Sequence, residues 1–95
     1  MSKYEAMFIM KPDLSEEERK ALFNQINEIV NKNQGNVTQG SVWAERRKFF
    51  FPLKKCHEGL YYLLNFSISP LAVKEMQNAF NLNENILRVL ISVLD

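Results

Sequence analysis

The residues whose types and spacing suggest binding chemistry lie in one short segment. Between positions 46 and 55 the chain carries basic residues and no acidic one; the bases are Arg46, Arg47, Lys48, Lys54 and Lys55. A run of aromatic residues, Phe49, Phe50 and Phe51, separates the two basic groups. Basic side chains neutralise phosphates and aromatic faces stack on unpaired bases, so this pattern is typical of a nucleic-acid-binding surface. A solvated charged turn explains the charges alone equally well.

The residues that could support catalysis form weaker patterns. Cys56 and His57 are adjacent, and neighbouring side chains in extended backbone point opposite ways, so they make a poor catalytic dyad. His57 is the only histidine, which rules out a site with two histidine ligands. The acidic run Glu16–Glu18 is best explained as charge at a helix N-terminus. No glycine-rich phosphate loop is present. We therefore expect no enzyme activity, no metal ion and no cofactor.

Composition and length limit the class of protein. The chain has 95 residues, 46% of them hydrophobic, and a formal net charge of +1. This length predicts one domain spanning residues 1–95. No apolar run approaches the roughly 20 residues that a membrane span needs, so we expect no membrane association. Cys56 has no intramolecular disulfide partner, which fits a reducing, cytoplasmic compartment.

The hydrophobic periodicity and the turn residues predict six elements. Ser15 and Glu18 form a capping-box pattern at the start of a helix, and Gly35 is expected to end that helix. Pro52 is expected to end the second strand, because proline cannot donate to a strand ladder. The predicted elements are strand Tyr4–Met10, helix 15–34, strand Asn36–Phe51, strand Leu60–Ile68, helix 69–81 and strand Ile86–Leu94.

This order of elements predicts an α+β fold of the ferredoxin-like β-α-β-β-α-β type. Its four-stranded antiparallel sheet should carry both helices on one face, leaving the other face open to solvent or to a partner. Tyr4, Phe8 and Leu90 are expected on the open face, where large apolar groups often mark an interaction surface. Phe50 is expected in the core, on the strand face opposite to Phe49 and Phe51.

Two other functions remain open. The segment Gln39–Trp43 loosely resembles the phosphate-cradling segment of acylphosphatases, small enzymes that share this fold. In that family the segment follows the first strand, whereas here it lies in the second strand, so the cradle would be misplaced. A ligand-sensing domain of the same fold is the other alternative, although the three glycines of the chain stand at separate positions and not in one ligand loop.

Several segments, taken in order, resemble the bacterial small-subunit ribosomal protein S six family. They are Lys3-Tyr4-Glu5, Lys11-Pro12-Asp13-Leu14, Gly35 with Val37, Arg46–Leu53, Gly59–Tyr62 and Asn83–Arg88. The resemblance spans essentially the whole chain. The chain departs from the family at Ala44-Glu45, where a glycine is missing, and at Phe49–Phe51, which replaces Leu-Ala-Tyr and removes a phenolic hydroxyl. The C-terminal tail of the family does not follow Asp95, so no tail contact is expected.

The resemblance implies a structural role in the small ribosomal subunit. It implies binding to the central domain of small-subunit rRNA as a heterodimer with ribosomal protein S eighteen, without a small-molecule substrate. By position, RNA contacts are expected at Lys3, Tyr4, Phe51, Lys54, Lys55 and Arg88. Arg46 and Arg47 are expected to contact either the RNA or the protein partner.

Overall fold

Residues 1–94, which the computed structural model describes, form a four-stranded antiparallel sheet and two α-helices in the order β-α-β-β-α-β. The predicted tail boundary at Asp95 lies outside the described residues. The elements are β1 (Ser2–Met10), α1 (Glu16–Lys32), β2 (Asn36–Leu53), β3 (Cys56–Ile68), the 3-10 turn η1 (Pro70–Ala72), α2 (Val73–Asn81) and β4 (Ile86–Val93). The ferredoxin-like fold predicted from the sequence is therefore confirmed.

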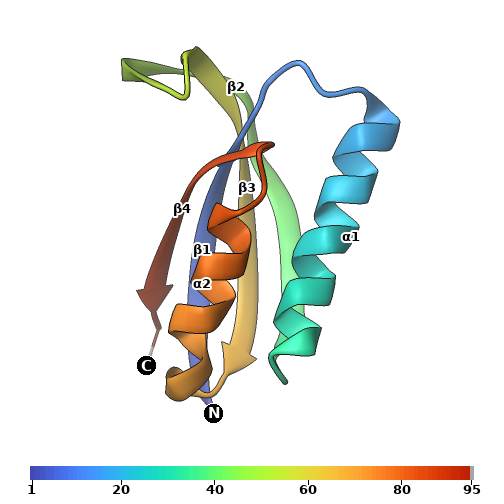
Figure 1. Ribbon diagram of the computed structural model, residues 1–95, viewed down its shortest axis with the longest axis vertical. Helices are drawn as coiled ribbons and strands as arrows, with labels where there is room; N and C mark the ends of the chain where they lie inside the picture. The colour runs from blue at the N-terminus through green and yellow to red at the C-terminus, as the bar shows by residue number, and fades with distance from the viewer. Residues whose placement is uncertain (95) are drawn as a thin grey trace.

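The sheet has the strand order β2-β3-β1-β4, with β1 and β3 in the centre. Every pair of neighbouring strands is antiparallel. The start of β1 and the end of β4 lie at one end of the molecule, and the β2–β3 hairpin projects from the other (Figure 1). No helix in the part of the chain that the structure describes is long and apolar enough to cross a membrane.

Local sequence signals account for the two ends of α1. The Ser15 hydroxyl accepts from the Glu18 N–H at 3.1 Å, and the Ser15 N–H donates to the Glu18 carboxylate at 2.9 Å. The capping box is thus confirmed, and the hydrogen bonds from the Ser15 backbone and side chain lower the pKa of Glu18. At the C-terminus, Gln34 takes the left-handed conformation with φ 61°, and the N–H of Gly35 donates to the Val30 carbonyl at 2.8 Å. Gly35 is needed here for space, because a Cβ would lie 2.7 Å from Val30 Cγ1.

The core fills the space between the helices and one face of the sheet. Even-numbered residues of β1 and β3 point into it, and they meet the apolar stripes of α1 and α2. Phe8 packs edge-on against Phe80 with ring centroids 4.8 Å apart, and Tyr62 stacks on Phe23 at 4.1 Å. Burial raises the pKa of the Tyr62 hydroxyl.

Two residues expected on the open face are in the core instead. Tyr4 is buried and stacks on Phe66 with centroids 5.7 Å apart, and Phe8 is fully buried. The error lies in the assignment of strand phase, because one residue of shift exchanges the two faces of a strand. Leu90, which is 45% exposed, lies outside the core as expected. Its register partner on β1 is Met7, one of the odd-numbered residues that face away from the helices.

Strand β2 is irregular, and this changes two expectations. It runs to Leu53, so Pro52 lies within the strand and does not end it. Lys48 pairs with Glu58 and Leu53 pairs with Cys56, which leaves residues 49–52 opposite one residue of β3. Bulged residues leave the ladder and need no donor, so a proline is tolerated among them. Phe50 is fully exposed at 102%, so the expectation that it lies in the core is wrong.

Candidate nucleic-acid interface

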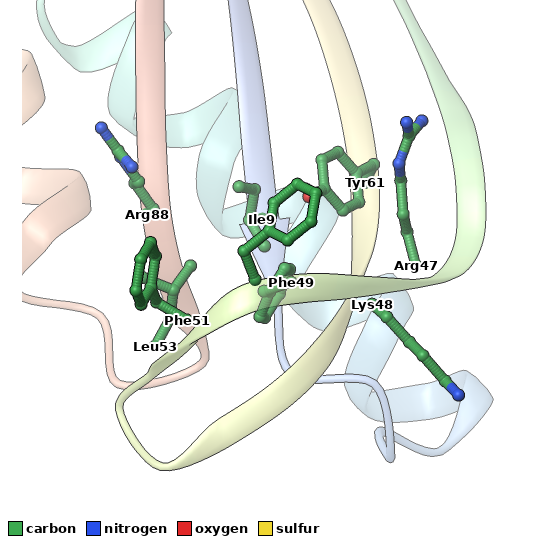
Figure 2. A pocket seen from close by; sticks show the side chains of 9 residues that line it. Ile9, Arg47, Lys48, Phe49, Phe51, Leu53, Tyr61 and Arg88 are labelled. Atoms are coloured by element: carbon green, nitrogen blue, oxygen red, sulfur yellow. The ribbon is translucent and has the colours of Figure 1, made fainter.

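The bulged end of β2 forms what we call the aromatic arch, residues 48–53. Figure 2 shows this segment crossing in front of the ends of β3 and β1 toward β4. Because four residues of β2 face one of β3, the extra residues let β2 bend away from β3. The arch therefore carries its aromatic residues across the open face of the sheet, while a regular strand would keep them at its edge.

A groove of about 320 Å³ lies between the arch and the sheet. The Phe49 side chain lines this groove. Its ring centroid is 6.3 Å from that of Tyr61, and the ring lies beside Ile9 (Figure 2). Phe51, at the other side of the groove, is 80% exposed and lies near Arg88. The groove thus presents apolar ring surface with a cation beside it.

Gly59 permits this close approach. A Cβ on Gly59 would lie 2.9 Å from Cζ of Phe49 and 2.8 Å from the Met10 carbonyl oxygen. Both distances are shorter than carbon side chains tolerate, so only glycine lets the Phe49 ring rest on the sheet at this point. Gly59 therefore lets the arch pack closely against the sheet.

The basic residues around the groove have different surroundings. The Arg47 guanidinium lies 4.9 Å from the centroid of the Trp43 ring and 6.0 Å from that of Tyr61, which is cation–π geometry. Arg88 is exposed on β4 and also lines the groove. Lys54 donates from Nζ to the Ile86 carbonyl at 2.9 Å, which fastens the hairpin to the start of β4.

Arg46 is held by acidic neighbours. Its guanidinium forms ion pairs with Asp13 at 2.6 Å and with Glu58, joining the β1–α1 loop to β2 and β3. The hydrogen bonds to Asp13 and then to Glu58 raise the pKa of Arg46. Its charge is largely balanced within the chain, so Arg46 is less suited to bind phosphate than Arg88 or Lys55.

The hairpin turn consists of Lys54 and Lys55, and both residues have positive φ angles, 46° and 68°. A two-residue turn with both central residues at positive φ matches the twist of its strands, and Asn-Gly is the pair that favours it. Lysine pays a conformational penalty in this position. The turn therefore presents two basic side chains at the tip of the hairpin at some cost in local stability.

Lys3 and Tyr4 lie at the far end of the sheet. Arg88 pairs with Ile9, and Lys3 precedes Ile9 by six residues on the same strand. Six residues of extended strand place Lys3 about 20 Å from Ile9. Tyr4 is in the core, so RNA contact through its ring face is not supported by this geometry. Contact at Lys3 stays a prediction, at a location apart from the groove.

The structure therefore brings together only some of the predicted residues. Arg47, Phe51 and Arg88 line one groove, and Lys54 and Lys55 form the adjoining turn. Sequence reasoning missed Ile9 and Tyr61 as parts of the groove. Both are odd-numbered residues that face away from the helices, and β1 and β3 are apolar at almost every position, so their sequences give little signal of which residues lie on that face.

Together the fold and the groove define a class of protein: a small ferredoxin-like domain with aromatic and basic side chains at one end of its uncovered sheet face. Residues 3–92 match the family model described as "Ribosomal protein S6". A curated relative, small ribosomal subunit protein bS6 of Caldanaerobacter subterraneus subsp. tengcongensis, is 36% identical over 91 residues, covering 96% of this chain and 95% of the relative. The bS6 protein of Exiguobacterium sibiricum is 35% identical over 92 residues, covering 97% and 96%.

A solved structure agrees with these matches. The crystal structure of 30S ribosomal protein S6 from Thermotoga maritima is similar with a TM-score of 0.86 and 28% identity, covering 98% of this chain and 87% of that chain. The chain belongs to the ribosomal protein S6 family. Its relatives are structural proteins of the small ribosomal subunit, a cytoplasmic particle in bacteria, and RNA binding and a role in translation follow from this membership.

Proposed function

We propose that this chain binds the central domain of small-subunit rRNA as a heterodimer with ribosomal protein S eighteen. The observation that supports the RNA contact most directly is the groove under the aromatic arch. It combines the exposed ring of Phe51 with the guanidinium of Arg88, next to a turn that carries Lys55. Ring faces accept stacked bases and the cations neutralise the phosphates that flank them.

The protein partner is proposed to bind the middle of the open sheet face. Met7 pairs with Leu63 on one side and with Leu90 on the other, so three apolar side chains form a row across β3, β1 and β4. Met7 and Leu63 are half-buried, and Leu90 is 45% exposed. An apolar row of this kind beside a basic groove suits a complex in which protein and RNA bind neighbouring parts of one face.

The partner contact is tested by Leu90→Glu. A carboxylate introduced at the β4 end of this row, at its most exposed member, would have to lose its water on complex formation, so the affinity for S eighteen should fall at least about tenfold. Leu82→Glu is the matched control, because Leu82 is 84% exposed just after α2, in the helical layer. The measurement is calorimetric titration of each folded variant with purified S eighteen.

The RNA part is tested by adding a central-domain transcript to the chain alone and to the preformed heterodimer. Tighter binding by the heterodimer is the expected result, because both partners then present one joint surface. Equal RNA affinity with and without S eighteen, or equal effects of Leu90→Glu and Leu82→Glu on the partner affinity, would contradict the heterodimer proposal.

The acylphosphatase alternative gains no support from the geometry. Gln39–Trp43 lies within strand β2 and not in a loop after β1, and the guanidinium of Arg46 is engaged by Asp13 and Glu58. Turnover of an acyl phosphate that Arg46→Ala abolishes would reverse this conclusion.

A further inference from the structure

Within residues 1–94, Glu5 is the one acidic residue of the sheet that forms no ion pair. The other acidic residues of the strands are Glu45, which is paired with Arg19, and Glu58, which is paired with Arg46. Glu5 is half-buried. Partial burial removes water from its carboxylate, and no ion pair within these residues offsets that loss.

The strand register places Glu5 on the open face, beside the apolar row proposed for the protein partner. From Tyr4 to Phe8, β1 pairs with both neighbouring strands without a register shift, so alternate residues share a face and Glu5 lies on the same side as Met7. Glu5 pairs with Asn65 of β3 and with Ser92 of β4. This polar row runs about 7 Å from the apolar row, so a partner that covers Met7 also reaches Glu5.

Asn65 adds a hydrogen-bond acceptor next to the carboxylate. Its side-chain oxygen Oδ1 is enclosed and has no hydrogen-bond partner among the residues that the structure describes. An enclosed polar atom without a partner lowers stability and calls for an explanation. The terminal torsion of asparagine is roughly two-fold, so a half-turn brings this oxygen to the open face beside Glu5. A donor on a bound partner would then reach both groups.

The charge at this position favours a basic protein side chain over RNA. The Glu5 carboxylate attracts a cation and repels phosphate. Arginine fits best, because its planar guanidinium has five N–H donors, pairs with a carboxylate through two parallel hydrogen bonds and keeps donors for Asn65. On the other side of the apolar row, Ile9 pairs with Arg88, so the row has an anion on one side and a cation on the other.

We propose that Glu5 and Asn65 bind a basic side chain of the protein partner, an arginine by preference, beside the apolar row. The apolar row supplies contact area. Glu5 fixes the direction in which the partner lies across the sheet, because the reversed direction would place the partner's cation beside Arg88. This inference rests on the proposed heterodimer, and it names the chemical group of the partner that this part of the open face recognises.

The test is calorimetric titration of the full chain with purified S eighteen, without RNA, over a salt series. Glu5→Gln keeps the shape of the side chain and removes its charge. It should lower the affinity for S eighteen at least about tenfold and make that affinity less sensitive to salt. Glu5→Asp should recover part of the loss. Glu28→Gln is the matched control, because Glu28 is exposed on α1, and it should leave both quantities unchanged.

Double-mutant cycles identify the basic residue of the partner. Each arginine or lysine of S eighteen is replaced by glutamine in turn and titrated with the wild type and with Glu5→Gln. One replacement should weaken binding to the wild type and have little effect on binding to Glu5→Gln, because the contact that it removes is already lost. Thermal unfolding verifies that the Glu5 variants are folded.

Three outcomes overturn the inference. The first is Glu5→Gln binding S eighteen as tightly as the wild type; the heterodimer proposal then stands if Leu90→Glu weakens binding, and a changed affinity for the rRNA transcript would assign Glu5 to an RNA contact. The second is a set of cycles in which no basic residue of S eighteen is coupled to Glu5. The third is a wild-type chain that does not bind S eighteen, which overturns the heterodimer proposal as well.

Discussion

Adjacent residues of the same type have different surroundings at positions 46 and 47. Arg46 is bound by the carboxylates of Asp13 and Glu58, and Arg47 lies against the ring of Trp43. The sequence presents them as a pair, and it left open whether each contacts RNA or protein. The two partners of Arg46, Asp13 and Glu58, are 33 and 12 residues away along the chain, and such contacts are not visible in local sequence patterns.

Gly59 is the residue on which the shape of the groove most depends. Gly59→Ala should lower the free energy of unfolding by about 1–3 kcal/mol, because the new methyl group would overlap the Met10 carbonyl and the Phe49 ring. Chemical denaturation monitored by circular dichroism measures this change. An unchanged midpoint would show that Phe49 does not rest on Gly59 in solution.

Among the elements, the β2–β3 turn has lysines at two positive-φ positions, where glycine has no conformational penalty. Lys55→Gly should stabilise the fold by about 0.5–1 kcal/mol. Glycine adopts the left-handed conformation at φ 68° without the penalty that lysine has, and the larger entropy of the unfolded chain with glycine offsets part of this gain. The same change should weaken RNA binding, since it removes a basic side chain from the tip of the hairpin.

Gln34→Gly is the matched control for Lys55→Gly. Gln34 is also left-handed, with φ 61°, but it lies at the end of α1 and away from the arch. Gln34→Gly should raise the midpoint of thermal unfolding in a similar way while leaving the affinity for the rRNA transcript unchanged. Weaker RNA binding by both variants, or by neither, would argue against a functional reason for the lysine turn.

The elements also show what can be predicted from sequence and what cannot. The capping box of Ser15 and Glu18 and the order of the strands follow from local patterns, and the structure confirms them. The position of Phe50 does not follow, because the rule of alternating faces assumes a continuous ladder and fails where four residues face one. The phase of β1 was also misassigned, since Tyr4 through Met10 is apolar at almost every position and shows no clear alternation.

In the whole molecule, the two faces of the sheet have different surroundings. One face and the helices supply the core, and the other face carries the apolar row of Met7, Leu63 and Leu90 with the arch at one end. The chain-long resemblance predicted the family, which the comparisons confirm, while the charge of +1 alone gave little indication of RNA binding. In the proposed RNA contact the basic side chains beside the arch act locally, so their placement matters more than the total charge.

A salt titration tests the proposal that the groove and the turn beside the arch hold RNA phosphates. The preformed heterodimer carrying Lys55→Ala and Arg88→Ala is compared with the wild type and with a control carrying Lys20→Ala and Lys74→Ala. The control pair is exposed on the two helices. We expect the slope of log affinity against log salt to fall by about 1.4–1.8 in the first variant and to stay unchanged in the control. An unchanged slope in the first variant, or an equal fall in both, would contradict it.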